Sequence, residues 1–302
     1  NLWVFQQKTI VKKVLVFVLV VFTSTFFAQN KSPKVGLVLS GGGAKGLAHI
    51  GVLEEIEKTG LQIDYIGGTS MGAIVGGLYA AGYSSKQIKE IVQKIDFTSL
   101  LQDQFPRNAL PFFEKEFGEK HAFALPVTKS GIQLPKAVSK GQNVLDLLTY
   151  ILSPVDSIKD FSKLPTPFFC VATNVENGKE ILLEKGFLPL ALRASGAFPT
   201  LLNPVELNGK LLVDGGVANN FPVDVMKSKG VDFIIGVDVQ KGLRNRHDLT
   251  SAVAILNQIV SYDVYRESKD RLKLLDLHIQ PDISDFSVVD FNRADEMIVK
   301  GA

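Results

Sequence analysis

The sequence predicts an α/β fold of three layers, α/β/α, built on a mostly parallel central sheet. Two observations predict it. Short apolar runs of strand length alternate with segments of helical spacing, and glycine-rich turns join the first strands to the helices that follow them. Strands connected through helices pair in parallel and are covered on both faces. The 302 residues, 46% of them hydrophobic, suffice for one large domain, which we expect over residues 33–302.

In the first half of this domain, the sequence predicts two strand–helix units followed by another helix. Residues 34–40, KVGLVLS, form a continuous apolar run, and residues 47–60 have helical spacing that ends on a glycine, a frequent C-cap. Residues 63–70 predict a second short strand, and residues 71–82 a helix of small residues. Residues 84–95 predict an amphipathic helix that starts on a serine cap.

The second half interrupts this order and then resumes it. Residues 97–135 are rich in Phe and Pro and predict loops with a hairpin. Regular elements return after them. In order, we expect a helix (141–152), two strands joined by a turn at Asn177-Gly178 (165–184), a helix (185–200), a hairpin (204–216), a strand (231–239), a long helix (249–275) and a last strand (276–283).

Residues 1–28 are typical of a secretory signal peptide. They carry Lys8, Lys12 and Lys13, then the apolar run VLVFVLVVF, then a polar break and Ala28 as a cleavage residue. The apolar run is short for a transmembrane helix, although an uncleaved anchor is the alternative. We therefore expect export to the periplasm, to the outer membrane or out of the cell. The chain starts without Met and ends within a helical pattern, so we expect both ends to be cut from a longer chain.

The charge balance and the single cysteine argue against a nucleic-acid partner and against a catalytic cysteine. The net charge is +2, and without residues 1–28, which hold three lysines and no acid, 30 basic and 31 acidic residues remain. Such a neutral body gives no reason to expect a nucleic-acid partner. Cys170 lies in the apolar run TPFFCVAT, where we expect a small buried strand residue without catalytic role.

The glycine loop SGGGAKG, residues 40–46, follows the first strand and admits two functional interpretations. It satisfies the dinucleotide fingerprint, with Asp64 at a suitable distance. However, Asp64 stands at the beginning of the second strand, not at its end, and no Lys-Ser/Thr pair completes a P-loop. Alternatively, backbone N–H groups of the loop stabilise the oxyanion of an acyl-transfer intermediate, with Lys45 adding positive charge. The third interpretation is a tight turn that only allows the following helix to pack closely.

Ser70 lies in IGGTSMGA, between a predicted strand and a predicted helix. This is the context of a nucleophile elbow, in which the turn strains the serine backbone and brings neighbouring residues close together. The residues two positions to either side must therefore be very small, and Gly68 and Gly72 meet that demand. Alone the motif is weak, but a glycine loop at the end of the neighbouring strand strengthens it, because parallel sheets place their sites at the carboxyl ends of strands.

A serine nucleophile needs a base, and the histidines do not supply an obvious one. By chain order His278 is the best histidine of a Ser-His-Asp triad, but it alternates with apolar residues on the last strand. Asp214 is better placed, since it follows a strand and precedes Gly215 and a second glycine that let a partner approach. Burial would raise its pKa towards that of a useful base. A simple Asp-Gly turn is the alternative. The other histidines are His49, His121 and His247.

These motifs together resemble the patatin-like phospholipases. The resemblance rests on GGGAKG (41–46), GTSMG (68–72), RASGAFP (193–199) and DGG (214–216), which occur in the family's order within residues 34–240. It implies a patatin-like fold and a Ser–Asp dyad in which Ser70 is the nucleophile and Asp214 the general base. It also implies an oxyanion hole formed by N–H groups of Gly41, Gly42, Gly43 and Ala44, and neither a metal nor another cofactor.

The resemblance predicts a serine lipid acyl hydrolase of the phospholipase A or lysophospholipase type. Its partners would be a lipid or phospholipid and a membrane surface. An acyltransferase or thioesterase using the same dyad is one alternative, and a nucleotide-binding or non-catalytic module is another. The signal-like segment further resembles a bacterial branch of the family in which an outer-membrane β-barrel follows in the full-length chain.

The Phe-rich stretch FPRNALPFFEKEF, residues 105–117, carries a separate hypothesis. Its four phenylalanines could cap the pocket or dip into a lipid surface. The alternative is core packing within an irregular insertion.

Overall fold

The central sheet lies in residues 34–302, which form one compact unit of the chain. The computed structural model describes residues 32–103, 127–128, 131–132, 137–240, 242–243, 245–249, 255, 258, 262 and 270–302. The predictions for the signal-like segment 1–28, for the Phe-rich stretch 105–117 and for most of the helix 249–275 therefore lie outside the described residues.

Eight strands build this sheet, and their order confirms the mostly parallel arrangement. From one edge, β12, β11, β1, β2 and β6 pair in parallel, whereas β10, β9 and β7 are antiparallel to their neighbours. The bounds are β1 Val35–Leu39, β2 Tyr65–Thr69, β6 Phe168–Asn174, β7 Glu180–Leu183, β9 Val205–Leu207, β10 Lys210–Asp214, β11 Phe233–Val237 and β12 Leu277–Ile279.

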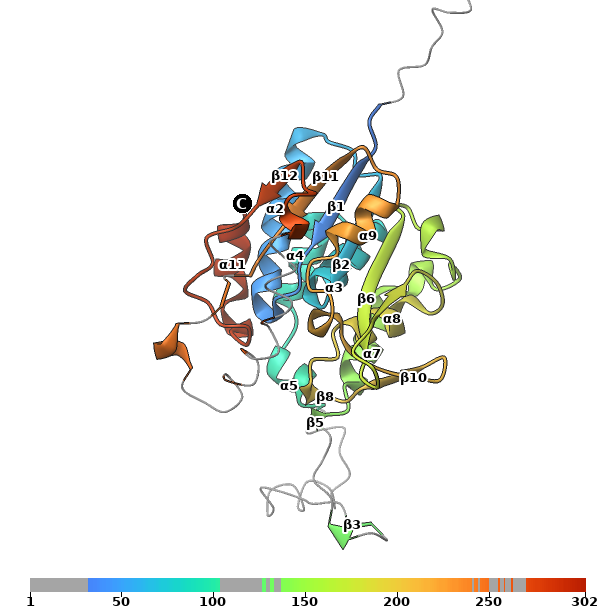
Figure 1. Ribbon diagram of the computed structural model, residues 1–302, viewed down its shortest axis with the longest axis vertical. Helices are drawn as coiled ribbons and strands as arrows, with labels where there is room; N and C mark the ends of the chain where they lie inside the picture. The colour runs from blue at the N-terminus through green and yellow to red at the C-terminus, as the bar shows by residue number, and fades with distance from the viewer. Residues whose placement is uncertain are drawn as a thin grey trace, which may run out of the picture. The chain divides into compact units, whose positions relative to one another are not determined.

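Helices cover both faces of the sheet, so the predicted three layers are confirmed (Figure 1). Side chains alternate along β1: Leu37 and Leu39 pack in the larger core with α2, α3, α4 and α8, whereas Val38 packs in a smaller core with α9. The helices are α2 Ala48–Thr59, α3 Met71–Ala80, α4 Ser85–Gln93, α5 Phe97–Leu101, α7 Gln142–Ile151, α8 Leu188–Ser195, α9 Val223–Ser228 and α11 Ala294–Gly301.

Short elements complete the described part of the chain. Two of them, η1 and η5, carry residues of the candidate site. The 3₁₀ helices are η1 Gly43–Leu47, η3 Ser153–Val155, η4 Phe161–Lys163, η5 Gly215–Val217, η6 Arg246–Asp248 and η7 Phe291–Arg293. The remaining strands are β3 Val127–Thr128, β4 Gly131–Ile132, β5 Ala137–Ser139 and β8 Thr200–Leu202.

Local chemistry explains where the predicted elements start and stop. Gly60 ends α2 in the left-handed conformation, with φ of 72°. Ser84 starts α4 in a capping box with Gln87. Asn208 and Gly209, with φ of 52° and 71°, form the turn between β9 and β10.

The region 97–135 differs in part from the prediction of loops and a hairpin. The antiparallel pair β3–β4 matches the hairpin. However, residues 97–101 form the helix α5, because the Asp96 side chain accepts hydrogen bonds from the N–H groups of Thr98 and Ser99. In the sequence, the signal that could have indicated this helix is Asp96, an acidic residue at its N-cap.

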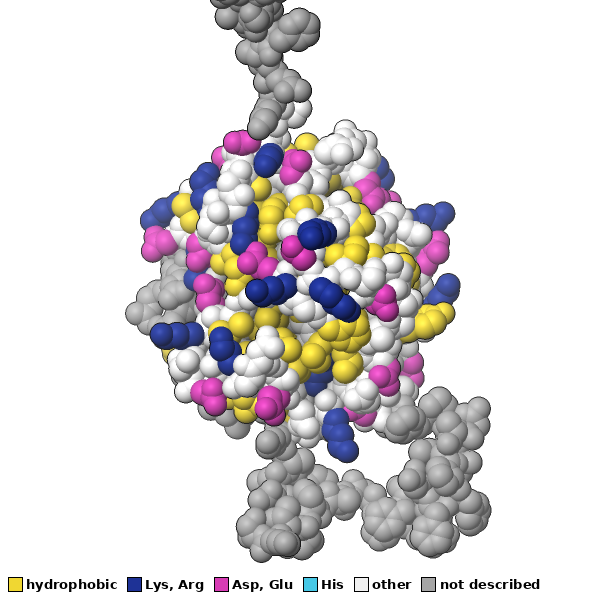
Figure 2. Space-filling model, turned by 90° about the vertical axis from the view of Figure 1, so that its right-hand side faces the viewer, with side chains coloured by type: hydrophobic (Ala, Val, Ile, Leu, Met, Phe, Trp, Pro, Cys, Tyr) yellow, Lys and Arg dark blue, Asp and Glu magenta, His cyan; other side chains and the backbone are white. Residues whose placement is uncertain are grey.

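The surface of the described residues carries charges of both signs. On the side that bears β6, β10 and α8, basic and acidic side chains intermingle with apolar ones between them (Figure 2). No helix within the described ranges is long and apolar enough to cross a membrane.

Candidate active site

The strands β2 and β10 meet end to end along one edge of β6. A strand has two edges, and β7 occupies one of them along residues 170–173 of β6. On the opposite edge, β2 runs parallel up to the pair Thr69–Val171, and β10 runs antiparallel up to the pair Asp214–Ala172. The carboxyl ends of the two strands therefore face each other over adjacent residues of β6. This topology places Ser70, the residue after β2, beside Asp214.

Ser70 adopts the strained backbone that the elbow motif predicts. Its φ is 55° and its ψ is −125°, a conformation rare for residues other than glycine. A Cβ atom on Gly68 would lie 2.7 Å from the carbonyl carbon and oxygen of Gly72, and a Cβ on Gly72 would lie 2.4 Å from the carbonyl oxygen of Leu39. Both positions therefore require glycine, as expected.

Ser195 of α8 supports this turn from the side. Its hydroxyl accepts a hydrogen bond from the backbone N–H of Ser70 at 3.0 Å and donates one to the carbonyl oxygen of Val171 at 2.6 Å. The same carbonyl excludes a side chain at Gly215, whose Cβ would lie 2.2 Å from it. Ser195 thus links the serine turn to β6, which is a structural role.

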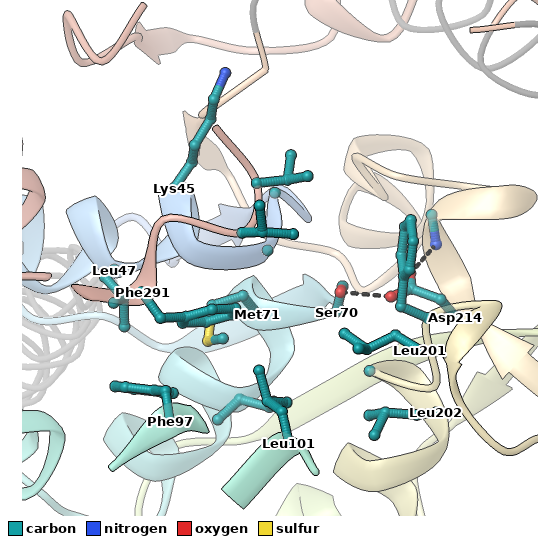
Figure 3. A pocket seen from close by; sticks show the side chains of 18 of the residues that line it. Lys45, Leu47, Ser70, Met71, Phe97, Leu101, Leu201, Leu202, Asp214 and Phe291 are labelled. Carbon is teal, nitrogen blue, oxygen red and sulfur yellow. Dashed lines mark hydrogen bonds between the residues drawn. The ribbon is translucent and has the colours of Figure 1, made fainter. Parts of the chain in front are cut away.

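Ser70 and Asp214 form a direct hydrogen bond. The Ser70 hydroxyl donates to Oδ2 of Asp214 at 2.6 Å, and the backbone N–H of Gly216 donates to Oδ1 at 2.7 Å (Figure 3). Asp214 is only 4% exposed. Burial raises the pKa of its carboxyl group to about 6, although the two hydrogen bonds act in the opposite direction. A carboxylate with this pKa accepts a proton more readily than an exposed one.

The glycine loop lies directly beside this pair. A Cβ on Gly41 would lie 3.1 Å from Cβ of Ser70. The N–H groups of Gly41 and Ala44 donate to the carbonyl oxygens of Asn220 and Val288, at 3.1 and 2.8 Å. Two of the four predicted oxyanion donors are thus engaged elsewhere in this conformation.

Gly42 and Gly43 are the donors that remain. Within the described ranges their N–H groups have no hydrogen-bond acceptor. Gly43 has φ of 56°, and a Cβ there would lie 2.3 Å from the carbonyl oxygen of Val288, so only glycine fits. Lys45 lines the same pocket, but its side chain extends away from the Ser70–Asp214 pair (Figure 3).

A cavity of about 940 Å³ opens at the dyad. Its polar part contains Ser70, Asp214 and the glycine loop. Most of its remaining wall is aliphatic or aromatic, supplied by α3, α4, α5, α7, α8 and the segment 284–291. Examples on this wall are Met71, Ile74, Leu101, Leu147 and Phe291. Such a cavity accommodates a long apolar chain next to a reactive polar end.

The other candidate residues lie apart from the dyad. His278 belongs to β12, which β11 and β1 separate from β2. His49 is fully buried, its Nε2 donates to the carbonyl oxygen of Ser40 at 2.8 Å, and burial lowers its pKa to about 4. His247 is exposed on η6, and His121 lies outside the described residues.

Cys170 and Asp64 also have structural explanations. Cys170 is a buried residue of β6, as expected, and burial raises the pKa of its thiol. Asp64 accepts a hydrogen bond from the N–H of Val35 at 2.7 Å, at the amino ends of β1 and β2. This is the opposite end of the sheet from the glycine loop, so Asp64 cannot serve a dinucleotide there. Among the described residues, no three His, Cys, Asp or Glu side chains gather into a group that could hold a metal ion.

Comparison with known proteins decides which family this site belongs to. The family description of the patatin-like phospholipases matches residues 37–227. The chain belongs to the patatin-like phospholipase family. The matched range contains the glycine loop, the Ser70 elbow, the segment with Ser195 and Asp214, which are the motifs on which the resemblance rests.

Relatives in sequence and structure agree with this membership. Lysophospholipase NTE1 of Meyerozyma guilliermondii is 34% identical over 212 residues, which cover 68% of this chain and 12% of that protein. An uncharacterized NTE family protein of Mycobacterium bovis is 31% identical over 210 residues, 70% of this chain and 50% of that one. The chain thus spans half or less of these relatives' length.

A solved structure supports the fold. The crystal structure of VipD from Legionella pneumophila aligns with a TM-score of 0.51 at 14% identity, covering 89% of this chain and 65% of that one. At this identity the likeness concerns the patatin fold alone.

Three residues around the patatin motifs emerge only from the structure. Asn220 and Gln240 contact the backbone of Gly41, and Val288 contacts that of Ala44. Asn220 lies four residues after the DGG motif, and this position is a weak sequence signal that it belongs to the site. Gln240 and Val288 stand in no motif, and they come from segments after the range that the family description matches.

Proposed function

We propose that this protein is a serine lipid acyl hydrolase of the phospholipase A or lysophospholipase type. The observation that carries the proposal is the 2.6 Å hydrogen bond from the Ser70 hydroxyl to the buried carboxylate of Asp214, at the polar end of a largely apolar cavity. Membership of the patatin-like phospholipase family and similarity to a lysophospholipase support it.

The first half of the reaction forms an acyl-enzyme. Oγ of Ser70 attacks the carbonyl carbon of the ester while its proton moves to Oδ2 of Asp214. The N–H groups of Gly42 and Gly43 stabilise the oxyanion of the tetrahedral intermediate. When the intermediate collapses, the ester C–O bond breaks and Asp214 returns the proton to the leaving alcohol oxygen.

The second half releases the fatty acid. Water attacks the acyl carbonyl and gives a proton to Asp214, and the same backbone donors stabilise the second oxyanion. Collapse of this intermediate breaks the bond to Ser70, whose oxygen recovers the proton from Asp214. The apolar wall around Met71 and Leu101 binds the acyl chain, because burying each methylene contributes about 0.8 kcal/mol.

Export and action at a membrane surface are part of the proposal. They are supported by the charged and apolar pattern of residues 1–28 and by the lipid substrate class that the family indicates. The downstream outer-membrane barrel stays a prediction of the resemblance.

Labelling with a fluorophosphonate, which reacts with activated serines, tests the nucleophile and its base. We expect rapid labelling of the wild type, none of Ser70→Ala, and labelling slowed at least about 100-fold in Asp214→Asn, since the base is lost. His278→Gln, the matched control, should label like the wild type. Persistent labelling of Ser70→Ala would refute the proposed nucleophile.

The products of a lysophospholipid assay separate hydrolysis from acyl transfer. Release of free fatty acid in water alone supports a hydrolase. An acylated alcohol or thiol acceptor, with little free acid, would instead show an acyltransferase that uses the same dyad.

A further inference from the structure

The carbonyl group of Gly41 is held by two side-chain amides from different parts of the chain. Nδ2 of Asn220 donates to this oxygen at 3.2 Å, and Nε2 of Gln240 donates to it at 2.5 Å. The N–H of Gly41 donates in turn to the backbone carbonyl of Asn220 at 3.1 Å. The peptide unit that follows Gly41 is therefore restrained at its oxygen.

The orientation of this oxygen determines the direction of the Gly42 N–H. In a trans peptide the C=O and N–H bonds point to opposite sides. With the Gly41 oxygen turned to the two amides, the N–H of Gly42 points away from them, and no acceptor for it lies among the described residues. Gly41 itself lies against Ser70, and Gly42, Ser70, Asn220 and Gln240 line the same cavity.

Without these amides the peptide would be free to reorient. Glycine on both sides removes most of the steric barrier to rotating a peptide plane. A rotated peptide would direct the Gly41 oxygen, which is electronegative, to the place where the N–H had been. That oxygen would repel an oxyanion instead of stabilising it.

The backbone that carries the Gln240 amide is held on both sides of its Cα. The backbone N–H of Gln240 donates to Oδ1 of Asp238 at 2.8 Å, and the backbone carbonyl of Gln240 accepts from Nε2 of Gln280 at 2.9 Å. Asn220 ends the segment that begins at Asp214. Its side-chain amide packs against Gly216, where an added Cβ would lie only 2.6 Å from Oδ1 of Asn220. The segment with the proposed base thus continues directly into the contact with the glycine loop.

We propose that Asn220 and Gln240 are positioning residues that hold the Gly41–Gly42 peptide with its N–H directed at the oxyanion. This inference rests on the proposed acyl hydrolysis and assigns to that site two residues that act through the Gly41–Gly42 peptide. Their contribution is to the transition state, in which the negative charge develops, and not to binding of the ground-state ester.

The test replaces Gln240 and compares matched ester and thionoester substrates, in which the carbonyl is C=O or C=S. Sulfur accepts hydrogen bonds poorly, so an intact oxyanion hole favours the oxygen ester. We expect Gln240→Met to lower kcat about 10-fold with little change in KM, and to lower the oxygen-to-sulfur rate ratio by a similar factor. Gln240→Glu, which keeps the size but presents a carboxylate to the Gly41 oxygen, should lose more.

Gln142→Met is the control, because Gln142 is exposed on α7 and, among the described residues, its side-chain amide donates to Oδ1 of Asp146 alone. It should keep the wild-type kcat and rate ratio. A fall in the activity of Gln240→Met and Gln240→Glu at an unchanged rate ratio would overturn the inference, since a purely structural role lowers both rates equally. A wild type that hydrolyses no ester would instead refute the proposed function itself.

Discussion

At the scale of single residues, the proposed chemistry depends on one contact between positions 144 apart in the sequence. Asp214 is buried, yet it stays within reach of the Ser70 hydroxyl, and the N–H of Gly216 satisfies its second oxygen. In the proposed mechanism no histidine transfers the proton, because burial brings the pKa of the Asp214 carboxyl group to about 6. The proposal thus assigns nucleophile and base to two side chains.

The pKa of Asp214 predicts how activity depends on pH. Only the ionised carboxylate can accept the Ser70 proton, and its pKa lies near 6. The value of kcat/KM should therefore fall about tenfold per pH unit below 6 and reach a plateau above about 7. A pH profile with a soluble ester measures this, and a profile that stays flat down to pH 4.5 would contradict it.

Asp238 provides the control for that profile. Burial also raises the pKa of its carboxyl group, and it lies near the glycine loop through its contact with Ser40. If the acidic limb belongs to Asp214, then Asp238→Asn leaves its midpoint in place. If the midpoint of the fall in kcat/KM at low pH moves in Asp238→Asn, that fall reports the titration of Asp238 and not of Asp214, which would contradict the prediction.

At the scale of secondary structure elements, the site depends on how closely α3 crosses β1. Gly72 lies against the backbone of Leu39 and Ser40, where a Cβ would come within 2.5 Å of both carbonyl oxygens. Backbone atoms of a central strand cannot move aside without breaking pairs of the sheet. The first turn of α3, and with it Ser70, is thereby held against the glycine loop.

Gly72→Ala should therefore destabilise the protein strongly, by about 2 kcal/mol or more, through overpacking. Gly76→Ala is the matched control on the same helix, since its Cβ would meet only side chains, the nearest being Cγ2 of Ile66 at 3.0 Å. The gain in helix propensity offsets part of that contact. Thermal or urea unfolding of both variants measures the difference, and equal stability of the two would contradict the argument.

Elements and motifs were predictable to different degrees. Hydrophobic spacing and glycine, serine and asparagine signals identified most strands of the central sheet and most of its covering helices. The helices α5 and α9 and the short strands β5 and β8 were not predicted. The pairing of β10 with the same edge of β6 as β2 could not be predicted, because no local pattern specifies which edge an antiparallel strand joins. For the same reason the engagement of the Gly41 and Ala44 N–H groups was not foreseeable, since Asn220 and Val288 approach from distant parts of the chain.

At the scale of the whole domain, the residues after the family match complete the cavity. The segment 284–291 borders the glycine loop through Val288 and lines the cavity. The Phe291 ring stacks on that of Phe97 in α5, with centroids 4.7 Å apart. In Figure 3 both rings lie on the far side of Met71 from Ser70. We therefore expect this stack to limit the length of the acyl chain that the cavity accepts.

Phe291→Ala tests this limit, because removing the ring extends the cavity away from Ser70. We expect the chain length with the highest kcat/KM to increase by about two methylene groups, each of which adds roughly 0.8 kcal/mol of binding when buried. A series of esters from short to long acyl chains measures the shift. Phe187→Ala is the control, since Phe187 precedes α8 and does not line the cavity. An equal loss of activity at every length would mean that Phe291 stabilises the fold and does not select the substrate.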